Sequence, residues 1–357
     1  MKLSETLRLE LPASADMHVH LRQGDMMALV TPLIRRGGVD TVFVMPNLQP
    51  PVTSVAQALR YRDELLALDP NVRYLMSLFL HPSITPQVIA EAAEAGITGV
   101  KMYPQGVTTN SDSGVVSVDE YAAVFAEMER RHLVLNLHGE VATQPADNVS
   151  LEVAFLPVLH RLHRDYPRLR IVLEHCSTAE ALDAVRACGT SVAATITAHH
   201  LYLTGEMSDA DPLCFCKPVP KTSADRDALI RAVCSGDAKF FFGSDSAPHP
   251  LATKTGTQKV PAGVFTQPFA TQLVLLALEE AVERRVIDDS DVTQEKLELF
   301  LSRAGRRFYK LPEDANGARI LLERKGDKIP PYVASTDDKL QVGVSKAGSS
   351  VFSLRWL

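Results

Sequence analysis

The stretch Asp16-Met17-His18-Val19-His20-Leu21-Arg22 (DMHVHLR, residues 16–22) is where the barrel architecture of this chain first becomes visible. His18 and His20 are two positions apart in a short apolar run, so in a β-strand their side chains point to the same face. Two neutral imidazoles presented side by side suit a zinc-like ion. An ordinary strand with two hydrogen-bonded histidines has the same pattern, and the rest of the sequence has to separate the two interpretations.

Seven further short apolar runs follow, and longer amphipathic segments lie between most of them. Such runs predict buried strands, and the amphipathic segments predict helices. Eight strands alternating with helices predict an α/β fold with a parallel sheet, and eight strands close a (β/α)8 TIM barrel. An open doubly wound sheet is the alternative, but no G-x-G-x-x-G follows the first strand. The predicted strands are Ala15–His20, Thr41–Met45, Arg73–Phe79, Gly99–Tyr103, Leu133–His138, Arg170–His175, Ser191–Ile196 and Lys239–Gly243.

The last part of the chain has a different pattern from the barrel. Residues 311–357 contain short β-like pieces, Ala318–Leu322 and Val351–Leu354, separated by Gly and Pro. We therefore expect a barrel domain over residues 1–310 and a small C-terminal extension, 311–357, packed on it. The predicted helices are Ser54–Ala67, Thr85–Ala95, Val118–Arg131, Leu151–His163, Ala179–Ala187, Ala224–Cys234, Phe265–Arg284 and Thr293–Tyr309.

Composition narrows the class of protein. The 357 residues are 46% hydrophobic and 22% charged, which is typical of a soluble globular protein. A net charge of −6 gives no reason to expect nucleic acid or an anionic membrane as a partner. No apolar stretch reaches the ~18 residues of a membrane span, and MKLSETLRLELPAS lacks the apolar core of a secretion signal. Five cysteines, an odd number, favour reduced thiols and a cytoplasmic location, although Cys214 and Cys216 could bind a metal.

Chemically versatile residues recur where the predicted strands end. Catalytic groups of a (β/α)8 barrel lie at the carboxyl ends of its strands, so these side chains are expected to meet. Each has an ordinary alternative: a structural histidine, a snorkelling or Schiff-base Lys101, or an Asp245 that caps a turn. Their repetition over five strand ends favours a shared metal site. The residues are His18, His20, Lys101, His138, His175 and Asp245.

Seven segments carry a resemblance to a known family. They are DMHVHLRQGDMM, VFVMPNLQPPVT, GVKMYPQGVTTNSDSGV, LVLNLHGE, RIVLEHCST, GSDSAPH and PAGVFTQPFA, and they cover the chain from about residue 14 to about residue 270. In this order and spacing the sequence resembles the dihydroorotases of the amidohydrolase superfamily. The resemblance is to the compact type, which has no separate β-sandwich domain.

The resemblance implies a binuclear metal site. His18 and His20 would bind the more buried zinc together with Asp245, and His138 and His175 would bind the second zinc. Lys101 would be carbamylated at Nζ, so that a carbamate and a hydroxide bridge the two ions. The physical logic is that two adjacent dications need anionic bridging ligands, because neutral histidines supply no charge. Manganese or cobalt could replace zinc at such ligands.

The resemblance also implies a reaction. It is the reversible hydrolysis of the cyclic amide of L-dihydroorotate to N-carbamoyl-L-aspartate. Run as ring closure, this is the third step of de novo pyrimidine (UMP) biosynthesis. Asp245 would accept a proton from the nucleophile and deliver it to the departing ring nitrogen. The family further suggests that the protein is a homodimer. The expected binding partner besides the second subunit is the small-molecule substrate.

Substrate contacts follow from the same resemblance. Arg22 suits a bidentate contact with a carboxylate. The loop Gln105–Gly114 is rich in Gly, Ser, Thr and Asn, as a mobile lid would be. A surface arginine, a turn asparagine, a loop lysine and a passive polar loop are the ordinary alternatives. The expected contacts are Arg22, Asn47 and His249 at the carboxylate, Thr108 and Thr109 in the lid, backbone groups of Lys217 and Ala262 at the pyrimidine edge, and the metal-site residues His20 and His138.

Two other functions remain open at this point. A hydantoinase- or allantoinase-like cyclic amidohydrolase would share the ligands, but such enzymes usually build a β-sandwich from a longer N-terminal segment. Only 17 residues precede His18 here, and Arg22 follows the H-x-H pair at the carboxylate position. A catalytically inactive barrel that serves as a scaffold would typically have lost ligands, whereas all six are present.

Overall fold

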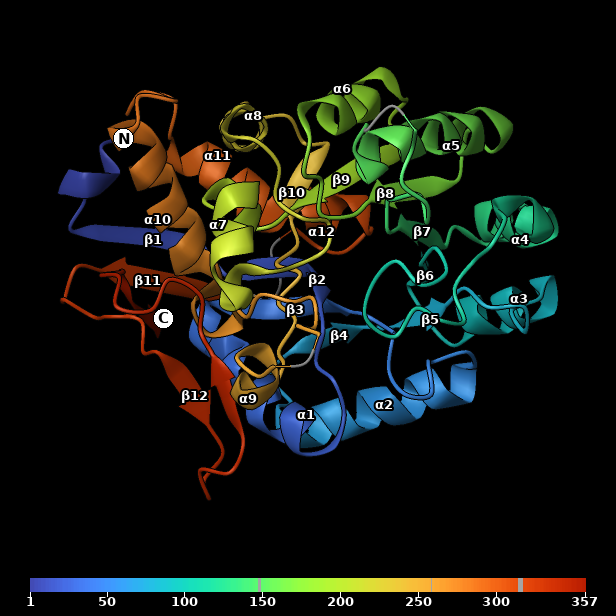
Figure 1. Cartoon of the computed structure of the whole chain (residues 1–357), viewed down its shortest axis with the longest axis horizontal. Coiled ribbons are helices and arrows are strands. Elements are labelled where there is room, and N and C mark those ends of the chain that lie inside the picture. Colours follow the sequence, from blue (N-terminus) through green and yellow to red (C-terminus); the bar gives the residue numbers. More distant parts are fainter. Residues whose placement is uncertain (147–148, 258, 314–316) are drawn as a thin grey trace.

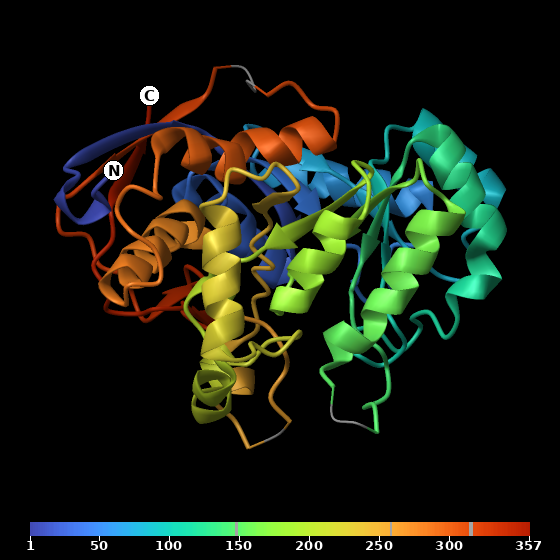
Figure 2. The same ribbon diagram turned by 90° about the horizontal axis from the view of Figure 1, so that it is seen from above.

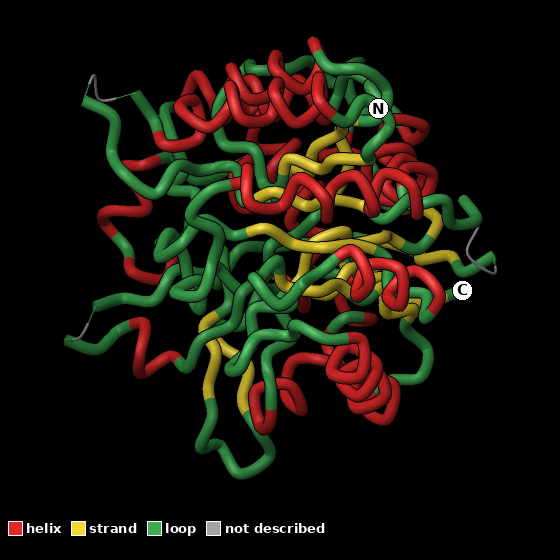
Figure 3. Tube along the Cα trace, turned by 90° about the vertical axis from the view of Figure 1, so that its right-hand side faces the viewer, coloured by secondary structure: helices red, strands yellow, loops and turns green. Residues whose placement is uncertain are grey.

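Parallel strands form a ring at the centre of the structure, and helices surround it (Figures 1 and 3). The computed structural model describes residues 1–146, 149–257, 259–313 and 317–357. Nearly every residue of the ring strands is buried, since the barrel interior covers one face and the helices cover the other. The ring consists of β2 (Ser14–Val19), β3 (Val39–Val44), β4 (Arg73–Leu75), β5 (Ser77–Phe79), β6 (Gly99–Met102), β7 (Val134–Leu137), β8 (Arg170–Leu173), β9 (Val192–Ile196) and β10 (Phe240–Phe242).

The ring consists of two hydrogen-bonded arcs that meet at both ends. One arc has the order β2-β3-β4 and the other β5-β6-β7-β8-β9-β10. β4 and β5 are one predicted strand that is interrupted at Met76. On the other side, Asp245 N donates to His18 O at 2.8 Å, and His20 N donates to Ser246 O at 3.1 Å. The predicted eight-stranded (β/α)8 barrel is therefore confirmed, with its closure made by the segment after β10.

The amino end of the barrel is filled and ion-paired. Met17, Phe43 and Phe241 form a buried cluster inside the ring. Arg306, 1% exposed, pairs with Asp40 and donates to the carbonyl of Ala13 and the hydroxyl of Thr41 beside that cluster. The inside of the barrel at this end is therefore a packed core.

The predicted helices are present with small changes at their ends. Helix α10 starts later than predicted, because the backbone N–H groups of Thr266 and Gln267 donate to Ser246 Oγ instead of entering a helix. The predicted helix Thr293–Tyr309 contains a π-helical turn, Leu299–Arg303, between α11 and α12. The helices are α1 (Gly24–Val30), α2 (Val55–Leu68), α3 (Pro86–Glu94), α4 (Ala122–Arg131), α5 (Leu151–Asp165), α6 (Ala179–Ala187), α7 (Gly205–Ala210), α8 (Ser223–Val233), α9 (Leu251–Lys254), α10 (Ala270–Glu283), α11 (Gln294–Glu298) and α12 (Ala304–Phe308).

A small antiparallel sheet joins the two ends of the chain on one side of the barrel (Figure 2). β1 (Arg8–Pro12) pairs with β11 (Arg319–Glu323), which pairs with β14 (Ser353–Trp356). β12 (Tyr332–Ala334) and β13 (Gln341–Gly343) form a separate hairpin. The short β pieces predicted for the tail are thus present, and the division at residue 310 stays a prediction. Within the described ranges, no helix is both long and apolar enough to cross a membrane.

Candidate active site

A polar pocket lies at the carboxyl ends of the barrel strands. Polar and titratable side chains converge on it, as they do in small-molecule sites. The predicted strand-end residues converge here from five different strands, as barrel geometry requires. The pocket is lined by His18, His20, Arg22, Asn47, Tyr103, Thr108, Thr109, His138, His175, Lys217, Asp245, Ala247, Ala262 and Gly263.

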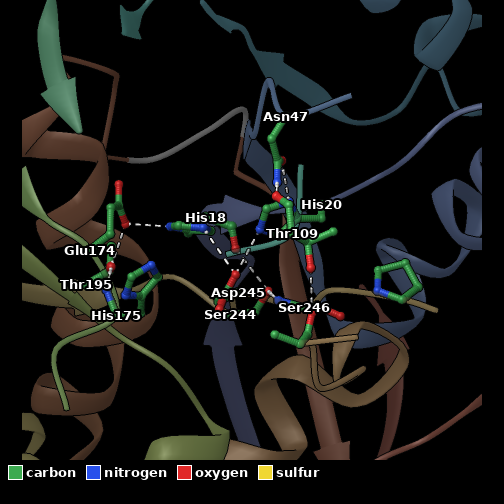
Figure 4. Close-up of polar contacts among 12 residues, drawn as sticks. His18, His20, Asn47, Thr109, Glu174, His175, Thr195, Ser244, Asp245 and Ser246 are labelled. Carbon is green, nitrogen blue, oxygen red and sulfur yellow. Dashed lines mark hydrogen bonds and ion pairs between the residues drawn. The ribbon is translucent and has the colours of Figure 1, made fainter. Parts of the chain in front are cut away.

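One carboxylate contacts both histidines of the H-x-H pair (Figure 4). Asp245 Oδ1 lies 3.2 Å from His18 Nε2 and 3.0 Å from His20 Nε2. Ligand atoms of His18, His175 and Asp245 lie within 4.8 Å of one another, and the ring of His138 is centred 4.7 Å from that of His175. The structure therefore brings these five side chains into one buried cluster. The partition of the ligands between two ions stays a prediction.

Second partners fix which ring nitrogen of each histidine faces the cluster. His18 Nδ1 lies 2.7 Å from Glu174 Oε2, and His138 Nε2 lies 2.8 Å from Glu140 Oε2. The proton stays on the nitrogen that faces Glu174 or Glu140, so the opposite ring nitrogen, Nε2 of His18 or Nδ1 of His138, becomes the electron-pair donor when a metal ion replaces any proton there. Metal-binding histidines are held in this way. The donor set therefore fits a metal ion.

Lys101 is completely buried beside these histidines. Among the described residues its Nζ has no hydrogen-bond partner, and it lies 4.8 Å from the ring centre of Tyr103. Burial lowers the pKa of Lys101 to about 8, although the carboxylates of Glu174 and Asp245 oppose that shift. An unpartnered buried amine is costly, because it has lost its water without gaining an acceptor. Its surroundings therefore fit a chemically modified or metal-linked lysine better than a free ammonium.

The carboxylates of the cluster attract positive charge. Burial disfavours a charged imidazole, but Glu174 and Asp245 outweigh it and raise the pKa of His18 to about 9. Burial also opposes ionisation of Asp245, yet His18 and His20 hold the pKa of its carboxyl well below the usual range. A dication bound by these groups would take the place of that proton. The electrostatics thus agree with the donor geometry.

Three pocket residues have left-handed backbone conformations. The φ angles are +60° at Arg22, +43° at His175 and +44° at Asp245. Non-glycine residues adopt this region rarely and at a cost, and such residues cluster at functional sites. The segment after each strand turns sharply at these positions, which aims the side chain over the barrel mouth.

The predicted carboxylate site is built around Arg22. Its Nε donates to Pro248 O at 3.1 Å, which holds the guanidinium against the segment that follows Asp245. His249 Nε2 lies 2.9 Å from Ala262 O and 3.2 Å from Arg22 Nη2. Asn47 lines the same pocket, and its Oδ1 lies 2.9 Å from His20 Nδ1. Asn47 therefore also orients a candidate metal ligand.

The loop Gln105–Gly114 lies over the pocket. Thr109 Oγ1 donates to Ala262 O at 3.3 Å, and Asn47 Nδ2 donates to Thr109 O at 3.0 Å. Asn110 Nδ2 donates to Asn47 O at 2.9 Å. These contacts connect the loop to the far side of the pocket, so the structure shows the predicted lid segment in contact with the site.

The sequence interpretation missed several residues of the site. Glu174 and Glu140 were not singled out, although each is within two residues of a predicted ligand in LEHC and LHGE. Tyr103 faces the pocket directly after the strand of Lys101. Outside the predicted site, His199 and His200 form a second buried group with Cys216. Both ring nitrogens of His200 have protein partners, Thr197 Oγ1 and Pro218 O, as expected of a structural histidine.

Comparison with known proteins assigns the family. The amidohydrolase family profile matches residues 10–281. A probable dihydroorotase of Schizosaccharomyces pombe is 49% identical over 92% of this chain and 95% of its own length. The dihydroorotase of Saccharomyces cerevisiae is 40% identical over 98% of both chains. The chain belongs to the dihydroorotase family of the amidohydrolases.

Solved structures agree with the dihydroorotase assignment. The Saccharomyces cerevisiae dihydroorotase in complex with 5-fluoroorotic acid superimposes with a TM-score of 0.90, at 39% identity, over 98% of this chain and 99% of the other. A Campylobacter jejuni dihydroorotase gives 0.82 at 30% identity, over 98% of this chain and 97% of the other. An L-hydantoinase of Arthrobacter aurescens gives 0.78 at only 16% identity, over 97% and 82% of the two chains, and shares the fold alone.

Proposed function

We propose that this chain acts as a dihydroorotase, which reversibly hydrolyses L-dihydroorotate to N-carbamoyl-L-aspartate, the third step of de novo pyrimidine biosynthesis. The observation that carries the proposal is one pocket that holds both the histidine–aspartate cluster and Arg22. The cluster suits hydrolysis of an amide, and Arg22 suits the carboxylate that distinguishes dihydroorotate from a simple hydantoin. Dihydroorotases that match nearly the whole chain support the same activity.

We propose further that the site holds two zinc ions. His18, His20 and Asp245 would hold one, His138 and His175 would hold the other, and Lys101 carbamylated at Nζ would join them. Support comes from the unpartnered buried amine and from the carboxylates that fix the histidine tautomers. When bound, such ions supply Lewis acidity that activates water and polarises the ring carbonyl.

Asp245 is the proposed proton carrier. Its carboxylate is buried and faces the pocket, and its low pKa keeps it ionised and able to accept a proton. During hydrolysis Asp245 takes the proton of the attacking water and gives it to the ring nitrogen as the C–N bond breaks. During ring closure the same oxygen removes the ureido proton, as microscopic reversibility requires.

Arg22 is the proposed carboxylate anchor. Because Nε is already bonded to Pro248 O, the remaining N–H groups of a fixed guanidinium are available to two carboxylate oxygens. His249 contacts the guanidinium, and Asn47, Lys217 and Ala262 line the same pocket, where the backbone groups of the last two would meet the pyrimidine edge. Thr108 and Thr109 lie above, where the loop would exclude water during the reaction.

The test is turnover by the purified full-length protein. Loaded with zinc, it should convert L-dihydroorotate to N-carbamoyl-L-aspartate, lose activity with a chelator, and regain it when zinc, cobalt or manganese is added. Hydantoin and allantoin should be poor substrates, since neither carries the carboxylate. No conversion of dihydroorotate by metal-loaded protein would contradict the proposal, and faster conversion of hydantoin would favour the hydantoinase alternative.

We also propose that the enzyme works in the cytoplasm as a homodimer. The five free cysteines support a reducing compartment. Light scattering on the purified protein should give twice the chain mass of 39.1 kDa. A mass of one chain would contradict the dimer.

A further inference from the structure

Lys254 is a buried lysine behind the wall of the pocket. It ends the short helix α9 and is only 3% exposed. Its ammonium donates hydrogen bonds to three backbone carbonyls, Phe215 O at 3.0 Å, Pro261 O at 3.1 Å and Gly263 O at 2.9 Å. In the part of the chain that the structure describes, no carboxylate pairs with this ammonium. All of its donors are therefore used to hold main chain.

The three carbonyls belong to two segments that border the pocket, the one around Phe215 and Lys217 and the one around Ala262. Pro261 and Gly263 flank Ala262, and Phe215 is two residues before Lys217. Ala262 and Lys217 both line the pocket, whereas Lys254 does not. The two segments also contact each other directly, since Gly263 N donates to Phe215 O at 2.9 Å. Lys254 thus joins both segments from outside the cavity.

The position of Ala262 has to be set closely, because other site residues depend on it. Ala262 O accepts the hydroxyl of Thr109 from the lid and lies 2.9 Å from His249 Nε2. Gly263 has a φ of +155°, and a Cβ there would lie 2.5 Å from Ala247 O. The segment is therefore packed closely against the chain that follows Asp245. A shift of Ala262 would disturb the hydrogen bonds that its carbonyl makes with Thr109 of the lid and with His249.

We infer that Lys254 is a positioning residue that sets the backbone groups of Ala262 and Lys217 for substrate binding. This inference rests on the proposed function, which places the pyrimidine ring against these groups. Three carbonyl oxygens that point at one place repel one another unless a donor lies between them. Charge-assisted hydrogen bonds from one ammonium satisfy all three and hold the segments together. Without the ammonium the two segments separate, and the backbone groups of Ala262 and Lys217 no longer lie where they can bind the substrate.

The chain contains a matched control. Lys239 directly precedes β10, and its ammonium donates to four backbone carbonyls at 2.7 to 3.1 Å. These acceptors are the carbonyls of Val185 in α6, of Cys188 and Gly189 directly after it, and of Val192 at the start of β9, and none of the four residues lines the pocket. The two lysines therefore share one chemistry and differ in what they position.

The experiment compares Lys254→Met with Lys239→Met in the zinc-loaded enzyme. For Lys254→Met we expect the KM for dihydroorotate and the Kd for 5-fluoroorotic acid to rise roughly ten- to hundredfold, because small misplacements weaken binding by such factors. Its kcat should change only a few-fold, and its zinc content should equal that of the wild type. Lys239→Met should lower the melting temperature and leave KM and Kd unchanged. Lys254→Arg, which keeps the charge and the donors, should recover part of the affinity.

Three results would overturn the inference. They are an unchanged Kd in folded Lys254→Met, an equal loss of affinity in Lys239→Met, and a Lys254→Arg variant as weak as the Met variant. If Lys254→Met does not fold, Lys254→Gln is judged by the same Kd, with the melting temperature as the check on folding. Loss of wild-type turnover would contradict the proposed function instead, because the Kd comparison does not require turnover.

Discussion

Glu174 and His18 form a buried pair, with His18 Nδ1 2.7 Å from Glu174 Oε2. The same carboxylate accepts the hydroxyl of Thr195 and the side-chain amide of Asn136, each at 2.6 Å. Two hydrogen bonds at Oε2 and one at Oε1 thus fix the carboxylate. His18 consequently presents Nε2 to Asp245 with its tautomer already set.

Glu174→Gln is predicted to weaken metal binding. A neutral amide holds the imidazole less firmly and lowers its basicity, and losses of about 10- to 100-fold in metal affinity are typical of such partners. Zinc retention against a competing chelator measures the effect. Glu152→Gln is the control, because Glu152 is equally buried but bonds Ser177 N and Thr178 Oγ1 rather than a predicted ligand. Equal zinc affinity in wild type and Glu174→Gln would contradict the prediction.

Arg22→Gln is predicted to lose affinity for the substrate carboxylate. Glutamine can donate one hydrogen bond but brings no charge, so the KM for dihydroorotate should rise by roughly 10- to 100-fold, as expected for losing a charge-assisted bidentate contact. Steady-state kinetics give the KM, and atomic absorption should show an unchanged zinc content. If the KM stayed at the wild-type value, the carboxylate would be bound elsewhere in the pocket.

Glu152 is predicted to make stability depend on pH. Burial raises the pKa of its carboxyl from the usual 4.5 to about 7, despite hydrogen bonds from Thr178 and Ser177. Between those two pH values the native state binds more protons than the unfolded chain, so the free energy of unfolding falls as pH rises from about 4.5 to about 7. Glu152→Gln cannot ionise and should lack this part of the slope.

Denaturant unfolding of wild type and Glu152→Gln at several pH values measures that difference. The free energy of unfolding of Glu152→Gln, taken relative to that of the wild type, should increase from pH 5 to pH 7 and then level off. A difference that is constant over this range would show that Glu152 titrates near its ordinary pKa. Excess zinc in every sample keeps the metal site filled, so that its own protonation does not enter the comparison.

The ion pair between Asp40 and Arg306 is predicted to be important for stability. Both side chains are at least nine-tenths buried, and Asp40→Asn would leave the guanidinium without its counter-charge. Breaking such a pair costs about 3–5 kcal/mol of unfolding free energy. Arg307→Gln is the neighbouring control, because its pair with Glu313 is exposed and should contribute less than about 1 kcal/mol. Equal, small losses in both variants would contradict the prediction.

The barrel and the meeting of its strand-end side chains could be predicted from the sequence because both follow from simple periodicities. Buried parallel strands give continuous apolar runs, and the carboxyl ends of such strands must meet, which places His18 near His175 although 156 residues separate the two. The interruption at Met76 and the late start of α10 have no such signal. They result from contacts made across the fold, such as the Ser246 hydroxyl that accepts the N–H groups of Thr266 and Gln267.

The supporting residues of the site were harder to find for the same reason. Glu174 looks like an ordinary strand-end acid until the fold places it beside His18. Lys254 looks like an ordinary lysine in a polar segment, and only the tertiary structure shows three carbonyls around its ammonium. The substrate contact of Asn47 stays a prediction, and nothing in the sequence indicated that its side chain also lies between His20 and the lid.

The position of Asn47 has a thermodynamic consequence. The side-chain Oδ1 of Asn47 contacts His20, and its Nδ2 donates to Thr109 O. One side chain therefore fixes both the geometry of a candidate metal ligand and the closed position of the loop. Two equilibria that share a contact are linked, and the linkage is reciprocal. A ligand that favours the closed loop should therefore slow the escape of zinc, and filling the metal site should in turn favour closure.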